Sequence, residues 1–502
     1  MSSTTLQETT DTAIADPEKA QQRPSEPDTD PVSAKDHQYE VTLEPEDDPQ
    51  QLPLALRWLT VFTISTASLC VTSASSAAAE TELAVAEKFG VSKEVGILGV
   101  SLFVLGLGLG PLITGPLSEL YGRNIVYRVS FFLFFAFTFP VAFAPSLAVF
   151  FVFRFVTGFC GSSFLSVAGG SVTDLFPNHQ VATPMALYTI SPFLGPIIGP
   201  IYGGFVNQNT TWRWTYWVLI IWSFAQLVAI LLIVPETYIP VLLKWKAQRL
   251  RKVTGDVSYY APIEKHDHSL ASMIIVSCYK PFQLVIFDRM ALLIDLWQVP
   301  FFTNSLLLGI LYLTFQAFPI VFEKGHGFNQ QMTGLTFLGI GLGLLIGLAT
   351  TPYWNSRFSL YEKRHGSTPP EFRLKQGQLG GVLVAISLFC VAFTTYPHVH
   401  WIVPIIASIP FGTGMYCSFV SSFTYLVIAY RPIAASAMAA NTAMRTVFAA
   451  AFPLFAPAMY HRLGTVGATA LLAGLTTVMA PLPFVFYKIG ARLRAQSRFA
   501  AH

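Results

Sequence analysis

The chain has little charge for its length. Only 12% of its 502 residues are Asp, Glu, Lys or Arg, and 53% are hydrophobic. Soluble domains carry about 25% charged residues, so the composition excludes an ordinary soluble protein. The net charge is only +3, and we expect no nucleic-acid partner. The composition instead predicts a protein whose main partner is the lipid bilayer.

Cysteines and catalytic signatures are also scarce. Four of the five cysteines lie in apolar runs and Cys278 lies in a polar loop, so we expect free thiols. There is no Walker A motif, no nucleophile elbow and no group of converging metal ligands. The runs GLGLG (106–110) and GIGLG (339–343) lie inside apolar stretches, where glycines serve packing. We therefore predict neither an enzyme nor an ATP-driven pump, and no cofactor or metal.

The apolar residues fall into runs of about 20, the length at which a helix crosses a bilayer. These runs predict an all-α membrane protein with twelve transmembrane helices in two six-helix bundles. The predicted spans lie near 56–79, 96–116, 124–144, 147–173, 181–206, 213–234, 299–322, 333–350, 377–396, 401–424, 436–460 and 466–487.

The polar stretches divide the chain into five parts. Residues 1–50 are acidic and rich in Pro, Gln and Thr, which predicts a disordered tail without a removable signal peptide. The two bundles are expected at 51–234 and 291–487, joined by a polar loop at 235–290. Residues 488–502 form a basic tail.

Lysine and arginine predict the orientation. They gather in the central loop, in the link 351–376 and after residue 487, which places these segments and both termini in the cytoplasm. Asn209 begins the sequon Asn-Thr-Thr in a loop on the opposite side, and it is the candidate for glycosylation.

The link between the second and third spans, GPLSELYGRN, carries an unusual set of residues: Gly115, Glu119, Gly122 and Arg123. The glycines allow a tight turn and a close helix approach. Glu119 can pair with Arg123 or face the N-terminal end of another helix. A plain charged loop that obeys the positive-inside rule accounts for Arg123 alone.

Several charged residues lie in or beside the spans: Arg154, Asp174, Asp295 and Arg445. A charge at that depth is costly, so it must face a partner, face water or extend to the interface. We consider all four as candidates for a functional role. Interface anchoring is the alternative for Arg154, Asp295 and Arg445, and a cap or loop charge is the alternative for Asp174.

The fifth span contains doubled Gly-Pro pairs and a final Gly-Gly: Gly195, Pro196, Gly199, Pro200, Gly203 and Gly204. Glycines four residues apart line one helix face and let a neighbouring backbone approach. Each proline removes a backbone donor and bends the helix.

These motifs together resemble the major facilitator superfamily. GPLSELYGRN is similar to its signature between spans two and three, and the fifth-span pattern is similar to the antiporter signature of the twelve-span drug:proton branch. The fourth span, WRWTYWVLI (212–220), PETYIPVLLKWKAQRLRK (235–252), GILYLTFQAFPIVF (309–322), AASAMAANTAMR and FPLFAPAMY resemble fungal drug:proton antiporters. The similarity covers about residues 50–500.

The resemblance implies bundles that rock around a central cavity and export small amphipathic compounds, such as toxins, pigments or drugs, in exchange for protons. Glu119 and Arg123 would belong to a cytoplasmic gate, Arg154 would take part in proton coupling, and the fifth span would shape the interface with the other half. Gln316 and Tyr425 are candidates for the cavity. Two positions depart from the pattern, since similar proteins usually have glutamate at Gln316 and often aspartate near Ile428. Coupling would then rely on Asp295, Asp174 or Glu119, or be weaker. The resemblance makes the charged residues in or beside the spans the candidates for proton coupling: Arg154, Asp174, Asp295 and Arg445.

Alternatives remain within and outside this class. Without coupling, the same fold suits facilitated uptake or the transport of polyamines and other organic ions. A sensor of this fold would carry a long cytoplasmic extension, and few residues follow Gly490. The resemblance favours a monomer in the plasma membrane.

Overall fold

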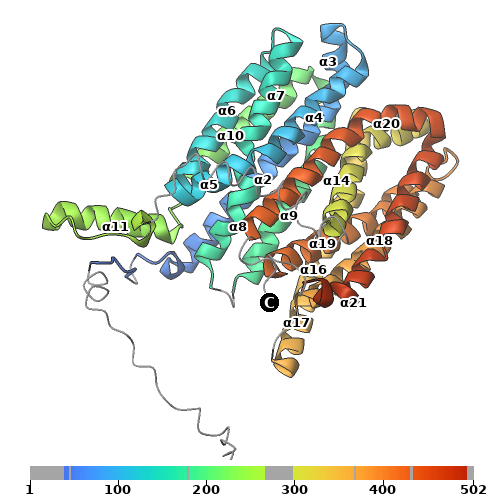
Figure 1. Cartoon of the computed structure of the whole chain (residues 1–502). Helices are drawn as coiled ribbons and strands as arrows, with labels where there is room; N and C mark the ends of the chain where they lie inside the picture. The colour runs from blue at the N-terminus through green and yellow to red at the C-terminus, as the bar shows by residue number, and fades with distance from the viewer. Residues whose placement is uncertain are drawn as a thin grey trace, which may run out of the picture.

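The structure is a computed structural model, and it describes residues 39–44, 47–177, 180–265, 298–366, 369–429 and 434–494. Helices make up almost all of this part of the chain (Figure 1). The one β-bridge among the described residues joins Glu40 to Tyr260 in parallel. The predicted all-α architecture is therefore confirmed.

The N-terminal bundle contains six crossings, two of them built from paired helices. Short helices η3 (Ala78–Thr81) and α3 (Glu82–Phe89) link the first crossing to the second. The crossings are α2 (Leu54–Ala77), α4 (Lys93–Leu109) continued by α5 (Pro111–Tyr121), α6 (Arg123–Ala142), α7 (Leu147–Gly161) continued by α8 (Ser163–Leu175), α9 (Ala182–Asn209) and α10 (Trp212–Ile233).

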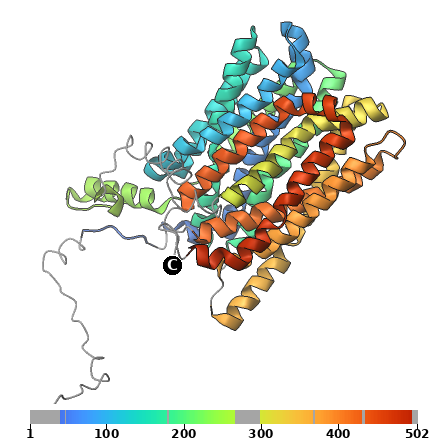
Figure 2. The same cartoon turned by 45° about the vertical axis from the view of Figure 1, so that its right-hand side comes forward.

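The C-terminal bundle repeats the plan. Its helices are α14 (Gln298–Phe318) extended by the π-turn η5 (Pro319–Lys324), α15 (Gln330–Thr336), α16 (Leu338–Ala349), α17 (Thr351–His365), α18 (Leu374–Thr394), α19 (Ile402–Ala429), α20 (Ala434–Met479) and α21 (Leu482–Arg494). Inside α20, Gly464 has φ 72° and ψ 171°, a backbone conformation that favours glycine. The chain turns back there, so α20 crosses twice (Figure 2).

This turn explains the number of spans. The described residues contain eleven helical segments long and apolar enough to cross a membrane, and the last, Asn441–Gly490, is long enough for two crossings. The twelve predicted spans are confirmed.

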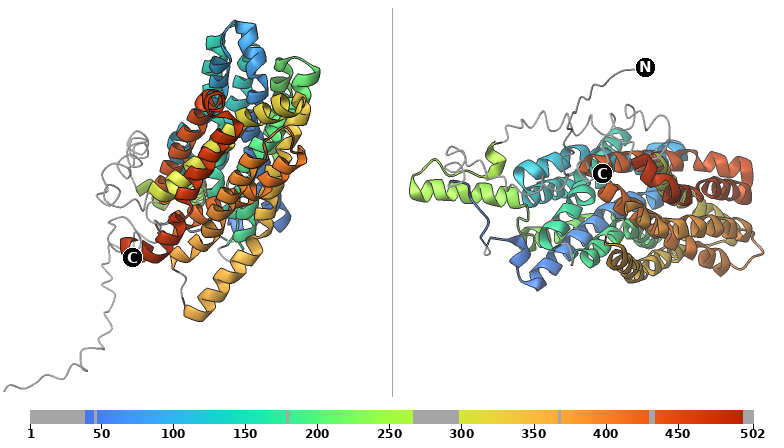
Figure 3. Two further views of the ribbon diagram at one scale, coloured as in Figure 1. Left: turned by 90° about the vertical axis from the view of Figure 1, so that its right-hand side faces the viewer. Right: turned by 60° about the horizontal axis from the view of Figure 1, so that its bottom comes forward.

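Two ends of the molecule are useful landmarks. The α11 end carries α11 (Ile239–Thr254) and α17, and the α3 end carries α3 and the turn at Gly464 (Figure 1). The bundles lie side by side (Figure 3). The seam, meaning the contact between the bundles, is formed mainly by α20 against α4 and by α9 against α15 and α16.

Helix α11 projects beyond the bundles and packs against residues 41–44 and 47, which precede α2. Val41, Ala247 and Ala261 form a small core, and Lys246 pairs with Glu44 at 3.0 Å and Asp47 at 3.1 Å. The predicted disordered tail extends to residue 50, whereas the structure places its last residues on α11. Residues 1–38 and 266–297 lie outside the described part of the chain.

Candidate functional site

The link between α5 and α6 is arranged around a half-buried carboxylate, Glu236, that sequence reasoning missed. Gly122 has φ 98°, and a Cβ on it would lie 2.3 Å from Oε2 of Glu236. Glu236 accepts hydrogen bonds from the backbone N–H groups of Arg123 (2.9 Å) and Asn124 (3.1 Å), which begin α6. It also accepts from those of Thr237 and Tyr238. An acid suits the positive N-terminal end of a helix.

The Arg123 side chain then reaches a different helix. Its Nε lies 3.3 Å from Oδ2 of Asp174 at the end of α8, and its Nη1 donates to Ser118 at 2.8 Å. Its guanidinium stacks 4.6 Å from the ring centre of Tyr238. The pair of Arg123 and Asp174 fixes the α5–α6 link against α8. The structure therefore brings two predicted residues together, although they are 51 positions apart.

Two other residues of the predicted motif have different surroundings. Glu119 lies half-buried on α5, which contacts α20 of the other bundle, and it makes no ion pair with Arg123. The sequence left two partners open for Glu119, Arg123 or the N-terminal end of another helix, and the pair with Arg123 is absent. A Cβ on Gly115 would meet nothing within 4 Å, so close packing does not require this glycine.

Arg154 is buried, with 1% of its surface exposed, and does not extend to the interface. Its Nε donates to the Gly99 carbonyl at 2.9 Å, and both terminal nitrogens donate to the Ala74 carbonyl at 3.1 and 3.2 Å. Ala74 lies in the last turn of α2. Arg154 thus ties α7 to α2 and α4.

The glycines of α9 face two different neighbours. Cβ atoms on Gly195, Gly199 and Gly203 would collide with α2 or η3, within the same bundle. A Cβ on Gly204 would lie 2.6 Å from the Gln330 carbonyl of α15, and the Pro200 carbonyl faces Gly334 of α15. Only the end of the motif therefore contacts the other half, while its first three glycines hold α9 against α2 and η3.

Polar and aromatic side chains meet midway along the seam. The Ser75 and Tyr312 hydroxyls are 2.7 Å apart, joining α2 to α14, and the rings of Phe193 and Phe419 lie 4.6 Å apart, joining α9 to α19. Arg445 of α20, 8% exposed, lies over the ring of Phe423 at 5.2 Å.

A pair of buried carboxyls lies at the seam near the α3 end. Gln316 of α14 donates from Nε2 to Oε2 of Glu82 at 2.7 Å, and Gln330 donates to the Glu80 carbonyl at 2.8 Å. Glu80 and Glu82 are 8% and 3% exposed. Sequence reasoning overlooked them because they follow the predicted end of the first span at residue 79. Two acids directly after an apolar run were the available signal.

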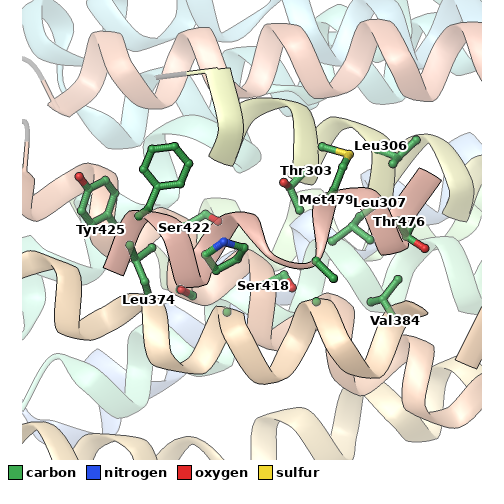
Figure 4. Close-up of a pocket in the computed structure, with 16 residues that line it drawn as sticks. Thr303, Leu306, Leu307, Leu374, Val384, Ser418, Ser422, Tyr425, Thr476 and Met479 are labelled. Carbon is green, nitrogen blue, oxygen red and sulfur yellow. The ribbon is translucent and has the colours of Figure 1, made fainter. Parts of the chain in front are cut away.

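The second cavity candidate, Tyr425, lies elsewhere. It lines a crevice inside the C-terminal bundle, between α14, α18, α19, α20 and α21 (Figure 4). Apolar side chains such as Leu306, Leu307 and Met479 line most of it, together with Ser418 and Ser422. The structure thus separates Tyr425 from Gln316, which lies at the seam.

The last two predicted positions are Asn209 and Asp295. Asn209 ends α9 as an exposed residue at the α3 end. Asp295 lies outside the described residues.

Comparison with known proteins agrees with this architecture. The family model of the Major Facilitator Superfamily matches residues 61–453. The chain is 52% identical over 401 residues to "Efflux pump atB" of Aspergillus terreus, covering 78% of this chain and 83% of the relative. It is 42% identical over 470 residues to "Probable drug/proton antiporter YHK8" of Saccharomyces cerevisiae, covering 92% and 90% of the two chains.

Solved structures show the same fold at low identity. The xylose transporter XylE from E. coli, in a partially occluded inward-open conformation, matches with a TM-score of 0.58 at 14% identity, covering 86% of this chain and 98% of that one. The human organic anion transporter MFSD10 matches with a TM-score of 0.57 at 16% identity, covering 89% and 100%. The chain therefore belongs to the Major Facilitator Superfamily of membrane transporters.

Proposed function

We propose that this protein is a secondary active transporter that exports small amphipathic organic compounds in exchange for protons. The observation that carries the proposal is the bond between Gln316 and Glu82, which places a carboxyl at the contact between the bundles. A proton-driven exporter needs a group that takes up a proton in one conformation and loses it in another. The names of the relatives, an efflux pump and a probable drug/proton antiporter, support the same reaction.

The geometry suggests how Glu82 serves this reaction. Separation of the bundles at the α3 end would break its bond with Gln316 and expose the carboxylate to water. Closure then returns the acid to a dry seam, where an unpaired negative charge is costly and the protonated form is cheaper to bury. Protonation of Glu82 thereby favours closure. Glu80 and Lys93 are the charged groups near Glu82, and Glu323 lies near Glu80.

The α11 end supplies the opposing gate in this account. The Arg123–Asp174 pair and the Glu236 cap hold the α5–α6 link as one rigid unit, and α5 contacts α20 of the other bundle. A rigid link transmits the movement of one bundle to the other. We place this end in the cytoplasm because the basic residues of α11 and α17 lie there.

The finer assignments belong to the same proposal. We propose a monomer in the plasma membrane, with cytoplasmic termini and bundles spanning 51–234 and 291–487. The exposed side chain of Asn209 at the opposite end is accessible to glycosylation on the outer face.

The experiment is efflux of fluorescent hydrophobic compounds from cells that express the chain, with and without a protonophore. We expect efflux that the protonophore abolishes. Transport that continues equally in both directions would identify a facilitator. Gln316 favours that second candidate, because an amide cannot exchange a proton.

A further inference from the structure

The buried cation Arg445 has no negative partner. No carboxylate in the described part of the chain forms an ion pair with it. Its Nε has no hydrogen-bond partner either. The polar neighbours that affect it electrostatically are the tyrosines Tyr188 and Tyr312. A buried guanidinium without an anion, and with its Nε unpaired, is costly, so the position calls for a negative ligand.

The other buried arginine provides a contrast. Arg154 donates to two backbone carbonyls, so its nitrogens are used in holding α2, α4 and α7 together. Arg445 is nearly as buried, but its Nε has no partner, and it forms no ion pair with the described part of the chain. Packing within the chain therefore accounts for Arg154 but not for Arg445.

A second unpartnered group lies on the same face of α20. Asn441 is one helical turn before Arg445, is 0% exposed, and has no partner for either atom of its amide. A buried amide without partners is costly, because its donor and acceptor have lost their bonds to water. An amide beside a guanidinium adds one donor and one acceptor for a ligand, whose oxygens can accept from both residues.

The surroundings define the rest of the ligand. Phe419 and Phe423 lie under the Arg445 guanidinium, at 5.9 and 5.2 Å from its central carbon. Phe193 of the other bundle lies against Phe419. These rings offer faces for stacking a flat compound. Both bundles contribute, because Tyr188 and Phe193 belong to α9.

We infer that Arg445 and Asn441 bind an anionic group of the transported compound, so that the substrates are flat organic acids with a carboxylate or an acidic phenol. This inference rests on the proposed function, since it names the substrate class of the transporter. Arg445 would thus act in substrate binding, which differs from the proton-coupling role that its position in the membrane suggested.

The test is binding to the purified full-length chain, which does not depend on transport. The probes are coumarin-3-carboxylate and its uncharged methyl ester, and the readout is the quenching of tryptophan fluorescence. A charged hydrogen-bonded pair predicts that the acid binds roughly tenfold or more tightly than the ester. Arg445→Gln should bring the two affinities within about twofold, and Arg445→Lys should keep part of the preference.

The matched control is Arg462→Gln, which removes an exposed arginine from the same helix and should keep the wild-type preference. If Arg445→Gln does not fold, Asn441→Leu provides the second variant, and it should weaken the acid more than the ester. Equal binding of acid and ester to the wild type would overturn the inference. An unchanged preference in a folded Arg445→Gln protein would do the same.

Efflux of the two probes from cells separates this inference from the proposed function. If the protonophore stops efflux but the acid and the ester bind equally, the exporter proposal is supported and the anion site is refuted. If Arg445→Gln abolishes the preference for the acid but the cells show no proton-driven efflux, the anion site is supported and the exporter proposal is refuted.

Discussion

Gln316 and Glu82 are hydrogen-bonded across the two bundles, at 2.7 Å, with both side chains buried. The second carboxylate oxygen, Oε1 of Glu82, has no partner. The acid therefore depends on the other bundle for its side-chain bond. When the bundles move, its surroundings change more than those of Glu236, whose backbone partners all lie in its own half or just after it.

Replacing Glu82 by Gln should separate transport from the proton gradient. The amide keeps the size of the side chain but cannot exchange a proton, so we expect loss of gradient-driven accumulation with substrate binding retained. Efflux at several external pH values measures this. Glu87→Gln, in the same helix α3 but exposed, is the control. Wild-type pH dependence in Glu82→Gln would show that the proton is carried elsewhere.

The Arg123–Asp174 pair predicts a gating defect. Asp174→Asn keeps the shape but removes the charge from a largely buried pair. Loss of such a pair costs about 1–3 kcal/mol after allowance for partial exposure. We expect slower export at equal surface expression, with partial recovery when the charges are exchanged in Arg123→Asp with Asp174→Arg. Lys252→Gln, an exposed charge on α11, should export normally. Normal export by Asp174→Asn would contradict this role.

Glu236 is expected to matter for stability. Its carboxylate satisfies four backbone N–H groups, two of them at the start of α6. Glu236→Ala leaves these donors without their partner and should lower the free energy of unfolding by about 1–3 kcal/mol. Glu236→Gln, which keeps one oxygen acceptor, should lose less. Thermal unfolding in detergent compares the two, and equal melting temperatures for both variants and wild type would refute the cap.

The α9 glycines should divide into two classes. Gly199→Ala places a Cβ 2.7 Å from the backbone nitrogen of Ala77, within one bundle, so overpacking of about 1–3 kcal/mol should reduce stability. Gly204→Ala instead presses on Gln330 of the other bundle and should impair closure at the α3 end, hence export, with a smaller loss of stability. Gly474→Ala meets nothing within 4 Å and serves as the control.

Melting temperatures and export rates of the three variants test this division together. The expected pattern is a lowered melting temperature for Gly199→Ala and a lowered export rate for Gly204→Ala. Equal losses of stability in both variants would mean that the two glycines do not differ in role.

The sequence predicted the crossings because each is an apolar run of the required length, including the turn near Gly464 that interrupts α20. It could not predict that Arg123 pairs with Asp174, since neither periodicity nor spacing relates residues on different helices. Glu82 and Glu236 were missed for a related reason. Each follows the end of an apolar run, where an acid normally faces water. Only the packing shows that Glu82 is buried and that Glu236 accepts from four backbone N–H groups.

Substrate efflux from liposomes that contain the purified chain, under an imposed pH gradient, tests the central claim most directly. The account predicts transport driven by the gradient, its loss when the gradient is collapsed, and its absence in Glu82→Gln. Equal rates with and without the gradient, in wild type and Glu82→Gln alike, would contradict proton-driven export and identify a facilitator.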